Sequence, residues 1–168
     1  CEGRGVEVMS YGTHADDIKL LATKPDATGT KIKISVEGQE YGVHLPLMGT
    51  FQVMNALAAL GIVLASGADA IDAVGALSKL EGVRGRLELV GTTRFGAPVF
   101  VDYAHTPDAL ETVIKALRPH CKGRIICVFG AGGDRDTGKR PEMGRVVKEN
   151  ADIAIITDDN PRSEDPAT

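Results

Sequence analysis

The 168-residue chain has few cysteines, no excess of basic residues and no long apolar run. Its three cysteines, Cys1, Cys121 and Cys127, are odd in number and poorly spaced for metal binding. This excludes a cysteine-based zinc site and a disulfide framework, and it favours the reducing cytoplasm. The formal net charge of -4 gives no basic surface for a nucleic-acid partner. Since no apolar run approaches the thickness of a bilayer and no secretory signal opens the chain, we expect no membrane insertion.

The chain also lacks an initiator methionine, because it opens with CEGRGVEVM. This start indicates either a processed protein or a piece of a longer one. With 43% hydrophobic and 25% charged residues, the composition is that of a globular protein. The length suffices for one domain or for parts of two.

Hydrophobic periodicity divides the first half of the chain into a hairpin and two helices. Residues 30–46 alternate apolar and polar side chains on both sides of the turn EGQE, which predicts a β-hairpin. Residues 51–65 and 70–80 change to helical spacing, with Thr50 and Asp69 as candidate N-caps. The side chains expected on the buried faces are Phe51, Met54, Leu57, Ala58 and Ile62 in the first helix and Ile71, Val74 and Leu77 in the second.

The second half of the chain alternates strands and helices. The expected strands cover residues 87–94, 98–103, 124–130 and 151–157. Thr106 followed by Pro107 opens one helix, and Pro141 opens another. Their apolar positions are Leu110, Val113, Ile114 and Leu117, and Met143, Val146 and Val147. Because the last three strands are apolar throughout and alternate with helices, they are expected to be parallel, in a sheet covered on both faces.

These patterns predict an α/β chain in two parts. Residues 1–94 contain the hairpin and the first two helices, and residues 95–168 begin a Rossmann-like domain with a parallel sheet. We place the boundary near residue 95, where the composition changes. Both parts are incomplete in this interpretation, because three parallel strands make a small sheet and no helix follows the last of them.

Three polar loops follow the expected parallel strands: DYAHTP at 102–107, GAGGDRDTGKR at 130–140 and TDDNPRSEDP at 157–166. Ligands of open α/β sheets bind outside the carboxyl ends of the strands, so three such loops predict a binding site. In the first loop, Asp102 can accept from ribose hydroxyls. His105 is either a general base or a structural hydrogen bonder.

The middle loop resembles two phosphate-binding motifs without completing either. GDRDTGKR nearly matches a P-loop, but Arg140 stands where a hydroxyl would coordinate Mg²⁺. GAGG fails the dinucleotide fingerprint, because Arg135 stands at the third glycine position. What remains is a glycine-rich backbone with three cations, Arg135, Lys139 and Arg140, which predicts anion binding. The alternative is a solvated basic turn.

The third loop predicts an amino-acid site. Arg162 offers a planar fork that matches a carboxylate, and Asn160 offers both a donor and an acceptor. Pro161 stiffens the turn between them. Four acids, Asp158, Asp159, Glu164 and Asp165, can attract an ammonium group. An EF-hand is excluded, because Pro161 and the missing glycine do not fit one. The alternative is a polar turn in which Asp159 or Asn160 caps local backbone.

Several of these segments together resemble the Mur ligase family. They are VFVDYAHTPDAL, VFGAGGDRDTGKRPEMG and ITDDNPRSEDP, preceded by GTFQVMNALAALG and VRGRLELV in the family's order. The resemblance covers residues 10–168, and the DNPR form is the one associated with diaminopimelate-adding members. It implies that residues 1–94 are the C-terminal part of the central ATP-binding domain and that residues 95–168 are the N-terminal part of the C-terminal ligase domain.

The resemblance also implies an activity. Family members are cytoplasmic, ATP-dependent amide ligases of cell-wall synthesis, and we expect a monomer. ATP, with Mg²⁺, phosphorylates the terminal carboxylate of UDP-MurNAc-L-Ala-D-Glu, and the amine of meso-diaminopimelate attacks the acyl phosphate. Such catalysis depends mostly on positioning and charge neutralisation.

Individual residues match family positions. The resemblance assigns Asn55, Arg86, Asp102 and His105 to ATP, and Arg135, Asp159, Asn160 and Arg162 to the incoming amino acid. Gln52 departs from the family, in which asparagine is common. The family's P-loop, carbamylated lysine, metal ligands and uridine-nucleotide domain would lie upstream of Cys1. We therefore expect no catalytic residue and no metal ligand in this segment, and no activity from it alone.

Three alternatives stay open at this point. A lysine-adding Mur ligase and a folylpolyglutamate-type ligase are the related enzymes, and the DNPR loop argues against both. A third possibility is a non-catalytic nucleotide- or anion-binding module built on residues 133–140. Binding of ATP alone, dependent on Lys139, would favour that module.

Overall fold

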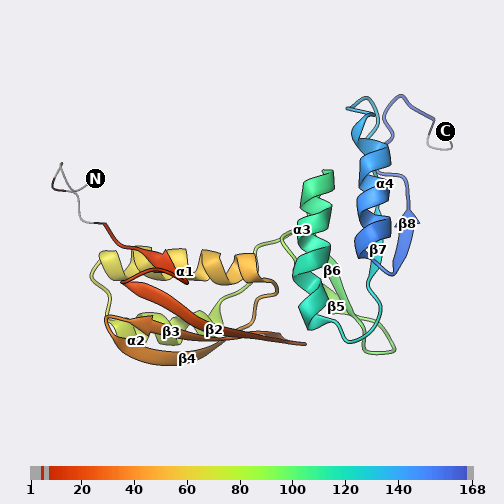
Figure 1. The fold of residues 1–168 in the computed structure, drawn as a ribbon. Coiled ribbons are helices and arrows are strands. Elements are labelled where there is room, and N and C mark those ends of the chain that lie inside the picture. The colour runs from red at the N-terminus through yellow and green to blue at the C-terminus, as the bar shows by residue number, and fades with distance from the viewer. Residues whose placement is uncertain (1–4, 6–7, 166–168) are drawn as a thin grey trace. The chain divides into compact units, whose positions relative to one another are not determined.

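The structure is a computed structural model that describes residue 5 and residues 8–165. The chain divides into two compact units, Cys1–Gly82 and Val83–Thr168 (Figure 1), and each is described by itself. The boundary expected at residue 95 passes through a hairpin that belongs entirely to the second unit. No described helix combines the length and the hydropathy that crossing a bilayer requires.

The first unit contains a four-stranded sheet in the order β1-β2-β3-β4. Its strands are β1 (Tyr11–Gly12), β2 (Ile18–Asp26), β3 (Gly29–Val36) and β4 (Gln39–Leu45). The predicted hairpin is confirmed as β3 and β4, which pair antiparallel with Ile34 opposite Tyr41. Strand β2 was missed because an irregularity between Leu20 and Ala22 interrupts its alternation of apolar and polar residues.

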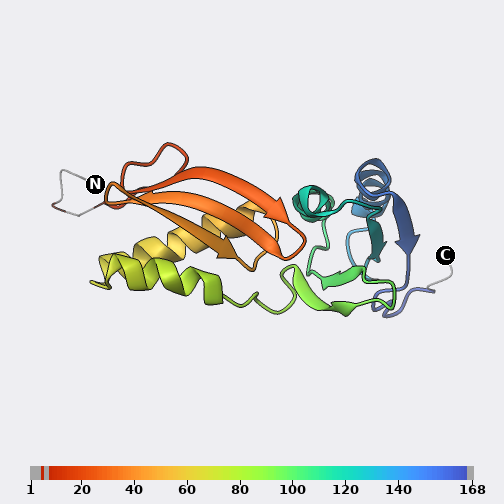
Figure 2. The ribbon, with the colours of Figure 1, turned by 90° about the horizontal axis from the view of Figure 1, so that it is seen from below.

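The remaining elements of the first unit are α1 (Thr50–Ala65), α2 (Ala70–Ala76) and the short 3₁₀-helix η2 (Leu77–Lys79). Both α-helices pack against the same face of the sheet (Figures 1 and 2). That face is built from alternate strand residues, among them Ile18, Ile32, Ile34 and Val36. The sheet therefore has one buried and one solvated face, as period-2 alternation predicts.

Helix α1 corrects two expectations. Gly49 occupies the N-cap position with φ 90°, and Thr50 is the first helical residue without a side-chain cap. The buried face also differs from the predicted one, because Ile62 is 70% exposed. The helix is apolar on several sides, so spacing alone did not define the face that meets the sheet. The buried residues are Gln52, Val53, Ala56, Leu57, Leu60 and Gly61.

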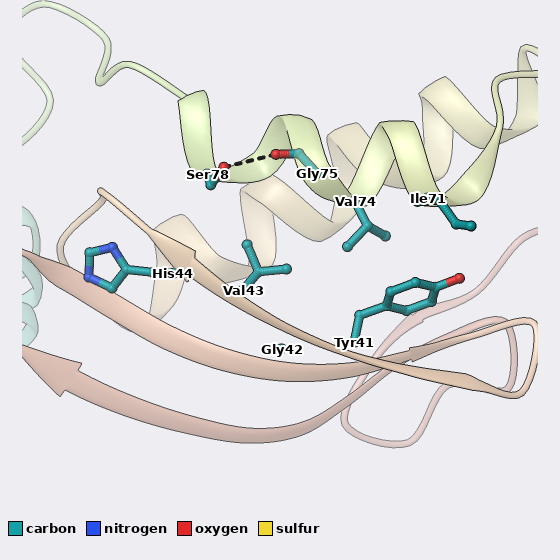
Figure 3. Close-up of a pocket in the computed structure, with 8 residues that line it drawn as sticks. All are labelled: Tyr41, Gly42, Val43, His44, Ile71, Val74, Gly75 and Ser78. Atoms are coloured by element: carbon teal, nitrogen blue, oxygen red, sulfur yellow. Dashed lines mark hydrogen bonds between the residues drawn. The ribbon is translucent and has the colours of Figure 1, made fainter.

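Helix α2 begins as predicted. The Asp69 carboxylate accepts from the backbone N–H groups of Ile71 and Asp72 at 2.9 and 3.1 Å, which satisfies two otherwise unpaired donors. Val74 is buried as expected, but Ile71 is 68% exposed. Ile71 instead lies at the edge of a groove of about 290 Å³ between β4 and α2 (Figure 3). The groove is lined by Tyr41, Gly42, Val43, His44, Ile71, Val74, Gly75 and Ser78.

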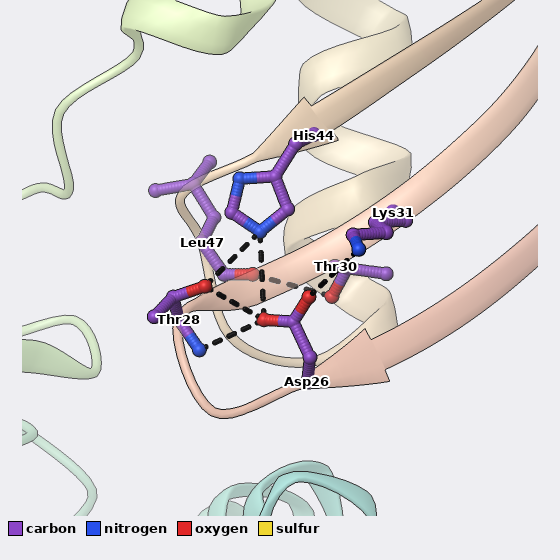
Figure 4. Close-up of polar contacts among 6 residues, drawn as sticks. All are labelled: Asp26, Thr28, Thr30, Lys31, His44 and Leu47. Carbon is purple, nitrogen blue, oxygen red and sulfur yellow. Dashed lines mark hydrogen bonds and ion pairs between the residues drawn. The ribbon is translucent and has the colours of Figure 1, made fainter.

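A polar cluster closes the turn between β2 and β3 (Figure 4). The Asp26 carboxylate accepts from the backbone N–H of Thr28 at 2.9 Å and from its hydroxyl at 2.7 Å. His44 of β4 adds a longer contact at 3.5 Å. These bonds, the backbone one first, lower the pKa of Asp26 to about 2. Next to the turn, a Cβ on Gly29 would lie 2.0 Å from the carbonyl oxygen of Leu45. The close approach of these two backbone segments therefore requires glycine.

The second unit contains two separate strand pairs. Strands β5 (Glu88–Thr92) and β6 (Pro98–Val101) form an antiparallel hairpin, and β7 (Ile126–Phe129) and β8 (Ile153–Ile156) are parallel. The α/β class is thus confirmed, but three parallel strands were expected. The described residues pair β6 with β5 alone, because the turn at 93–97 joins neighbouring strands that fold back on each other.

Two helices and a 3₁₀-helix complete this unit: α3 (Pro107–Leu117), η3 (Arg118–His120) and α4 (Lys139–Asn150). The two α-helices lie side by side (Figures 1 and 2). Their shared core contains Leu110, Ile114, Ile125, Met143, Val146 and Val147. The expectation that both sheet faces are covered is not met within the described residues, since Ile126, Val128, Ile155 and Ile156 are exposed. Apolar side chains favour burial, but they do not identify the element that covers them.

The starts of α3 and α4 follow the expected chemistry to different degrees. The Thr106 hydroxyl accepts from the N–H of Ala109 at 3.3 Å, and Pro107 is the first helical residue, as predicted. Helix α4 begins at Lys139, before Pro141, and has no side-chain cap. Proline is tolerated there because N–H groups of the first turn have no intrahelical partner.

Candidate functional site

The three predicted loops begin where β6, β7 and β8 end. The ladder between β7 and β8 continues one step further, because the N–H of Thr157 donates to the carbonyl oxygen of Phe129 at 3.0 Å. At this point a Cβ on Gly130 would lie 2.4 Å from the carbonyl oxygen of Thr157. Glycine is therefore required for the middle and third loops to leave the sheet next to each other.

The middle loop and the DNPR turn touch through Gly133. Its N–H donates to the carbonyl oxygen of Asn160 at 3.2 Å, and its own carbonyl oxygen accepts from Nη1 of Arg162 at 2.8 Å. A Cβ on Gly133 would lie 1.9 Å from the carbonyl oxygen of Pro161. Gly133, the third glycine of GAGG, thus lets the Asn-Pro-Arg turn come into backbone contact with the middle loop.

Two acids fasten the same loops reciprocally. Asp134 accepts from the hydroxyl of Ser163 at 2.6 Å and from its N–H at 3.3 Å. Glu164 accepts from the N–H of Asp134 at 2.7 Å and from Nη2 of Arg140 at 2.6 Å. We call these four residues, Asp134, Arg140, Ser163 and Glu164, the clasp. Each acid binds the backbone of the opposite loop, so the two loops are bound from both sides.

The clasp also changes the acidity of both carboxyl groups. Hydrogen bonds from the side chain and then the backbone of Ser163 lower the pKa of Asp134. The backbone hydrogen bond from Asp134 and the side-chain bond from Arg140 lower the pKa of Glu164. Donors that prefer a charged acceptor stabilise the ionised form. Both acids are therefore held in the ionised form that the clasp uses.

Three non-glycine residues of this cluster have left-handed backbone. Their φ angles are 53° at Asp134, 47° at Asn160 and 55° at Arg162. Such a conformation costs about 1 kcal/mol per residue, less for Asp and Asn, and persists where surrounding contacts impose it. Here the hydrogen bonds of the clasp and of Gly133 impose the left-handed conformation.

The predicted amino-acid contacts are grouped by this arrangement. Asn160 and Arg162 stand on either side of Pro161, and Arg135 and Asp159 lie on the two loops that meet at Gly133. The side chains of Arg135, Asp159 and Asn160 are exposed and have no hydrogen-bond or ion-pair partner among the described residues. One guanidinium, one amide and one carboxylate thus remain available next to Arg162, a donor and acceptor set suited to an amino acid.

The first loop gathers three of the four predicted ATP contacts. Asp102 accepts from the N–H groups of Leu87 and Ala104, each at 2.8 Å, and so ties the segment that carries Arg86 to the end of β6. The Arg86 guanidinium lies 5.3 Å from the ring centroid of Tyr103. The His105 ring packs edge-on against the same ring, also at 5.3 Å. Arg86 and His105 therefore share one aromatic neighbour.

Sequence reasoning missed Tyr103. It is 69% exposed at the end of a strand, where an aromatic side chain between Asp102 and His105 is a usable signal for a stacking surface. His105 also donates from Nδ1 to the carbonyl oxygen of Tyr103 at 2.9 Å, which agrees with the structural alternative for this histidine. The carbonyl oxygen of His105 accepts from Nζ of Lys139 at 2.9 Å, and this bond joins the first loop to the middle loop.

The fourth predicted ATP contact, Asn55, lies on α1 in the first unit. Its side-chain amide donates to the amide oxygen of Gln52 at 3.2 Å. Gln52 is buried and Asn55 is exposed, so the buried glutamine side chain accepts a hydrogen bond from the exposed asparagine. Among the residues that the structure describes, no three His, Cys, Asp or Glu side chains are grouped to hold a metal ion.

Comparisons with known proteins find matches for both parts of the chain. The family model described as the Mur ligase middle domain matches residues 1–63, and the model described as the Mur ligase, glutamate ligase domain matches residues 85–168. The UDP-N-acetylmuramoyl-L-alanyl-D-glutamate–2,6-diaminopimelate ligase of Zymomonas mobilis is 51% identical over 165 residues, covering 98% of this chain and 34% of that protein. The ligase of the same name from Caulobacter vibrioides is 51% identical over 164 residues, with the same coverage.

A solved structure of a ligase with this name superposes with a TM-score of 0.69 at 38% identity, covering 92% of this chain and 31% of that one. The chain thus spans about a third of the length of these relatives. The two family models together match most of its residues, including all three loops of the candidate site. The chain belongs to the Mur ligase family.

Proposed function

We propose that the protein carrying this chain is an ATP-dependent ligase that adds meso-diaminopimelate to UDP-MurNAc-L-Ala-D-Glu in peptidoglycan synthesis. Relatives that bear this activity in their names are 51% identical to the chain over alignments that cover 98% of it. The observation that carries the proposal is the contact between Arg162 and Gly133, which sets the DNPR turn against the GGDR segment. This contact supports the proposal that both predicted amino-acid motifs belong to one site.

In this proposal the second unit binds the incoming amino acid. Arg162 and Arg135 offer guanidinium groups to carboxylates, and Asn160 offers an amide to the ammonium or carboxylate of the same head group. Asp159, exposed next to Asn160, attracts the ammonium. Diaminopimelate carries a second amino-acid head group that lysine lacks, so a site with two arginines favours it over lysine.

The first loop is proposed to contact ATP. Arg86, Tyr103 and His105 form an exposed group with a cation and two aromatic rings, which suits a base or a phosphate. The Asp102 oxygens each accept one backbone N–H and retain lone pairs for a ribose hydroxyl. Asn55 remains a proposed ATP contact on the first unit.

In chemistry of this class, ATP phosphorylates a carboxylate and leaves as ADP, and the amine of the amino acid then attacks the acyl phosphate and displaces inorganic phosphate. The residues of this chain bind and orient the amine donor in that scheme. The described residues offer no carboxylate cluster for Mg²⁺, so we assign the ion no ligand here. We further propose that the protein acts in the cytoplasm as a monomer, and that its domain boundary lies at the division between the two compact units.

Substrate-dependent phosphate release by the full-length protein tests this function. With ATP and UDP-MurNAc-L-Ala-D-Glu present, we expect diaminopimelate to support turnover and lysine to give at least tenfold lower kcat/KM, the discrimination expected of one lost charged contact. Preferred turnover with lysine, or with glutamate on a folate acceptor, would replace the proposal with the corresponding related ligase. Binding of ATP without any amino-acid-dependent turnover would favour the non-catalytic module.

A further inference from the structure

The clasp holds the two loops that carry the proposed amino-acid contacts, yet none of its four residues was assigned to the substrate by the family match. Its bonds run from the middle loop to the third loop over 24 to 30 positions of sequence. The clasp bonds hold the residues that directly follow Asn160 and Arg162 in the chain. Gly133 forms hydrogen bonds with Asn160 and Arg162 themselves. The clasp is therefore placed to control the geometry of the turn without touching a ligand itself.

Backbone conformation explains why the turn needs such control. Asn160 and Arg162 are both left-handed, and Pro161 between them cannot donate a hydrogen bond. A free chain would leave these conformations for extended or helical ones. If the turn relaxed, Arg162 and Asn160 would no longer be held in one fixed relation to Gly133, and each binding event would require that order to be restored.

Glu164 makes the contact on which the clasp depends most. Its two oxygens accept from two different elements, one from the middle-loop backbone and the other from Arg140 in the first turn of α4. The Glu164 carboxylate compensates the positive charge of Arg140. The Nε atom of Arg140 is buried and has no hydrogen-bond partner among the described residues. Helix α4 packs in the core through Met143, Val146 and Val147. Glu164 thus connects the third loop to a helix that packs in the core.

We infer that Glu164, supported by Asp134 and Arg140, is a positioning residue for the amino-acid substrate, which holds Asn160 and Arg162 in their binding geometry before the substrate arrives. The inference rests on the proposed function, because it concerns the same site. It also adds to that function, since it assigns an acid of the third loop to loop geometry and removes it from the set of groups that attract the substrate's ammonium.

Three variants of the full-length protein test the inference. Glu164→Gln retains an oxygen for the N–H of Asp134 but loses the charge that pairs with Arg140, and Glu164→Ala loses both contacts. Glu149→Ala is the control, because Glu149 is an exposed acid of the same unit whose one ion-pair partner among the described residues is Arg145 on its own helix. Steady-state kinetics would be measured for diaminopimelate and for ATP with each variant.

We expect the KM for diaminopimelate to rise about tenfold in Glu164→Ala and less in Glu164→Gln, as loss of a charge-assisted bond predicts. The KM for ATP should stay within about twofold, and Glu149→Ala should match the wild type. Backbone hydrogen exchange of the segment around Asp134 should quicken in Glu164→Ala, since its N–H loses its acceptor. A variant that merely reduced the folded fraction would lower kcat and leave both KM values unchanged.

Unchanged KM for diaminopimelate in Glu164→Ala would overturn the positioning role, as would an equal rise in the KM for ATP. An ordering in which Glu164→Gln is impaired as much as Glu164→Ala would overturn the assigned role of the Asp134 contact. Absence of diaminopimelate-dependent turnover in the wild type is a different result, because it overturns the proposed function itself.

Discussion

Nη1 of Arg162 donates to the carbonyl oxygen of Gly133 at 2.8 Å, across 29 residues of sequence. One donor of the guanidinium is used in this bond, and the other four have no hydrogen-bond partner among the described residues, so they can meet a ligand. The arginine is thereby aimed by the middle loop while most of its binding capacity is retained. This relationship connects the two motifs on which the proposed amino-acid site depends.

Replacing Arg162 by Lys should separate charge from geometry. Lysine keeps the positive charge but lacks the planar fork, so it cannot bind Gly133 and a carboxylate together in the same way. We expect the KM for diaminopimelate to rise roughly tenfold or more, with little change in the KM for ATP. Arg145→Lys, on the exposed face of α4, is the matched control. Equal KM values for wild type and Arg162→Lys would contradict the assigned role.

Gly133→Ala should open the contact between the loops. The new Cβ would lie 1.9 Å from the carbonyl oxygen of Pro161, so the two loops must separate. We expect weaker diaminopimelate binding and a lower melting temperature. Gly144→Ala is the control, because nothing lies within 4 Å of its Cβ and alanine favours a helix by about 1 kcal/mol. Calorimetric titration measures the affinity of each variant for diaminopimelate. Similar affinities of Gly133→Ala and Gly144→Ala would contradict the expected opening of the loop contact.

Tyr103→Leu should weaken ATP binding selectively. The ring holds the Arg86 guanidinium at 5.3 Å and packs against His105, and an exposed cation–π contact is worth about 0.5–1 kcal/mol. We expect a two- to fivefold rise in the KM for ATP and an unchanged KM for diaminopimelate. Phe95→Leu removes a similar pair, with Arg94 at 4.6 Å, on the β5–β6 turn. It should leave both constants unaltered, and an equal effect of both variants would argue against a nucleotide role for Tyr103.

Acid should release the clasp. The pKa values of Asp134 and Glu164 are lowered in the folded protein, so their contribution to stability is present above the unfolded-state pKa values. It is lost as the pH falls through the lowered folded-state values. The stability difference between wild type and Glu164→Gln should therefore shrink on acidification from about pH 7 to about pH 3. Urea unfolding at a series of pH values measures this, and a constant difference would show that Glu164 does not titrate with the clasp.

Much of the fold could be predicted from local patterns in the sequence. Asp69 and Thr106 were predicted as caps because capping depends on residues two or three positions away. The hairpin of β3 and β4 followed from alternation on both sides of the turn EGQE. Strand β2 was missed because its bulge breaks the alternation, and the buried face of α1 was misassigned because apolar residues occur on several of its sides.

Long-range relations limited what could be predicted of the site. The rule for strand ends indicated that the three loops belong together, and the contacts of Lys139 with His105 and of Arg162 with Gly133 now connect them. The reciprocal bonds of Asp134 and Glu164 could not be read from either loop alone. They depend on a left-handed turn and on partners about 30 positions away, which no periodicity records.

A crystal structure of the full-length protein with diaminopimelate bound tests the central claim most directly. We expect a carboxylate of the amino acid within hydrogen-bond distance of the Arg162 guanidinium, with Asn160 in contact with the same head group. The clasp bonds and the bond from Arg162 to Gly133 should be retained in that complex. Diaminopimelate bound without contact to Arg162 or Asn160 would contradict the account.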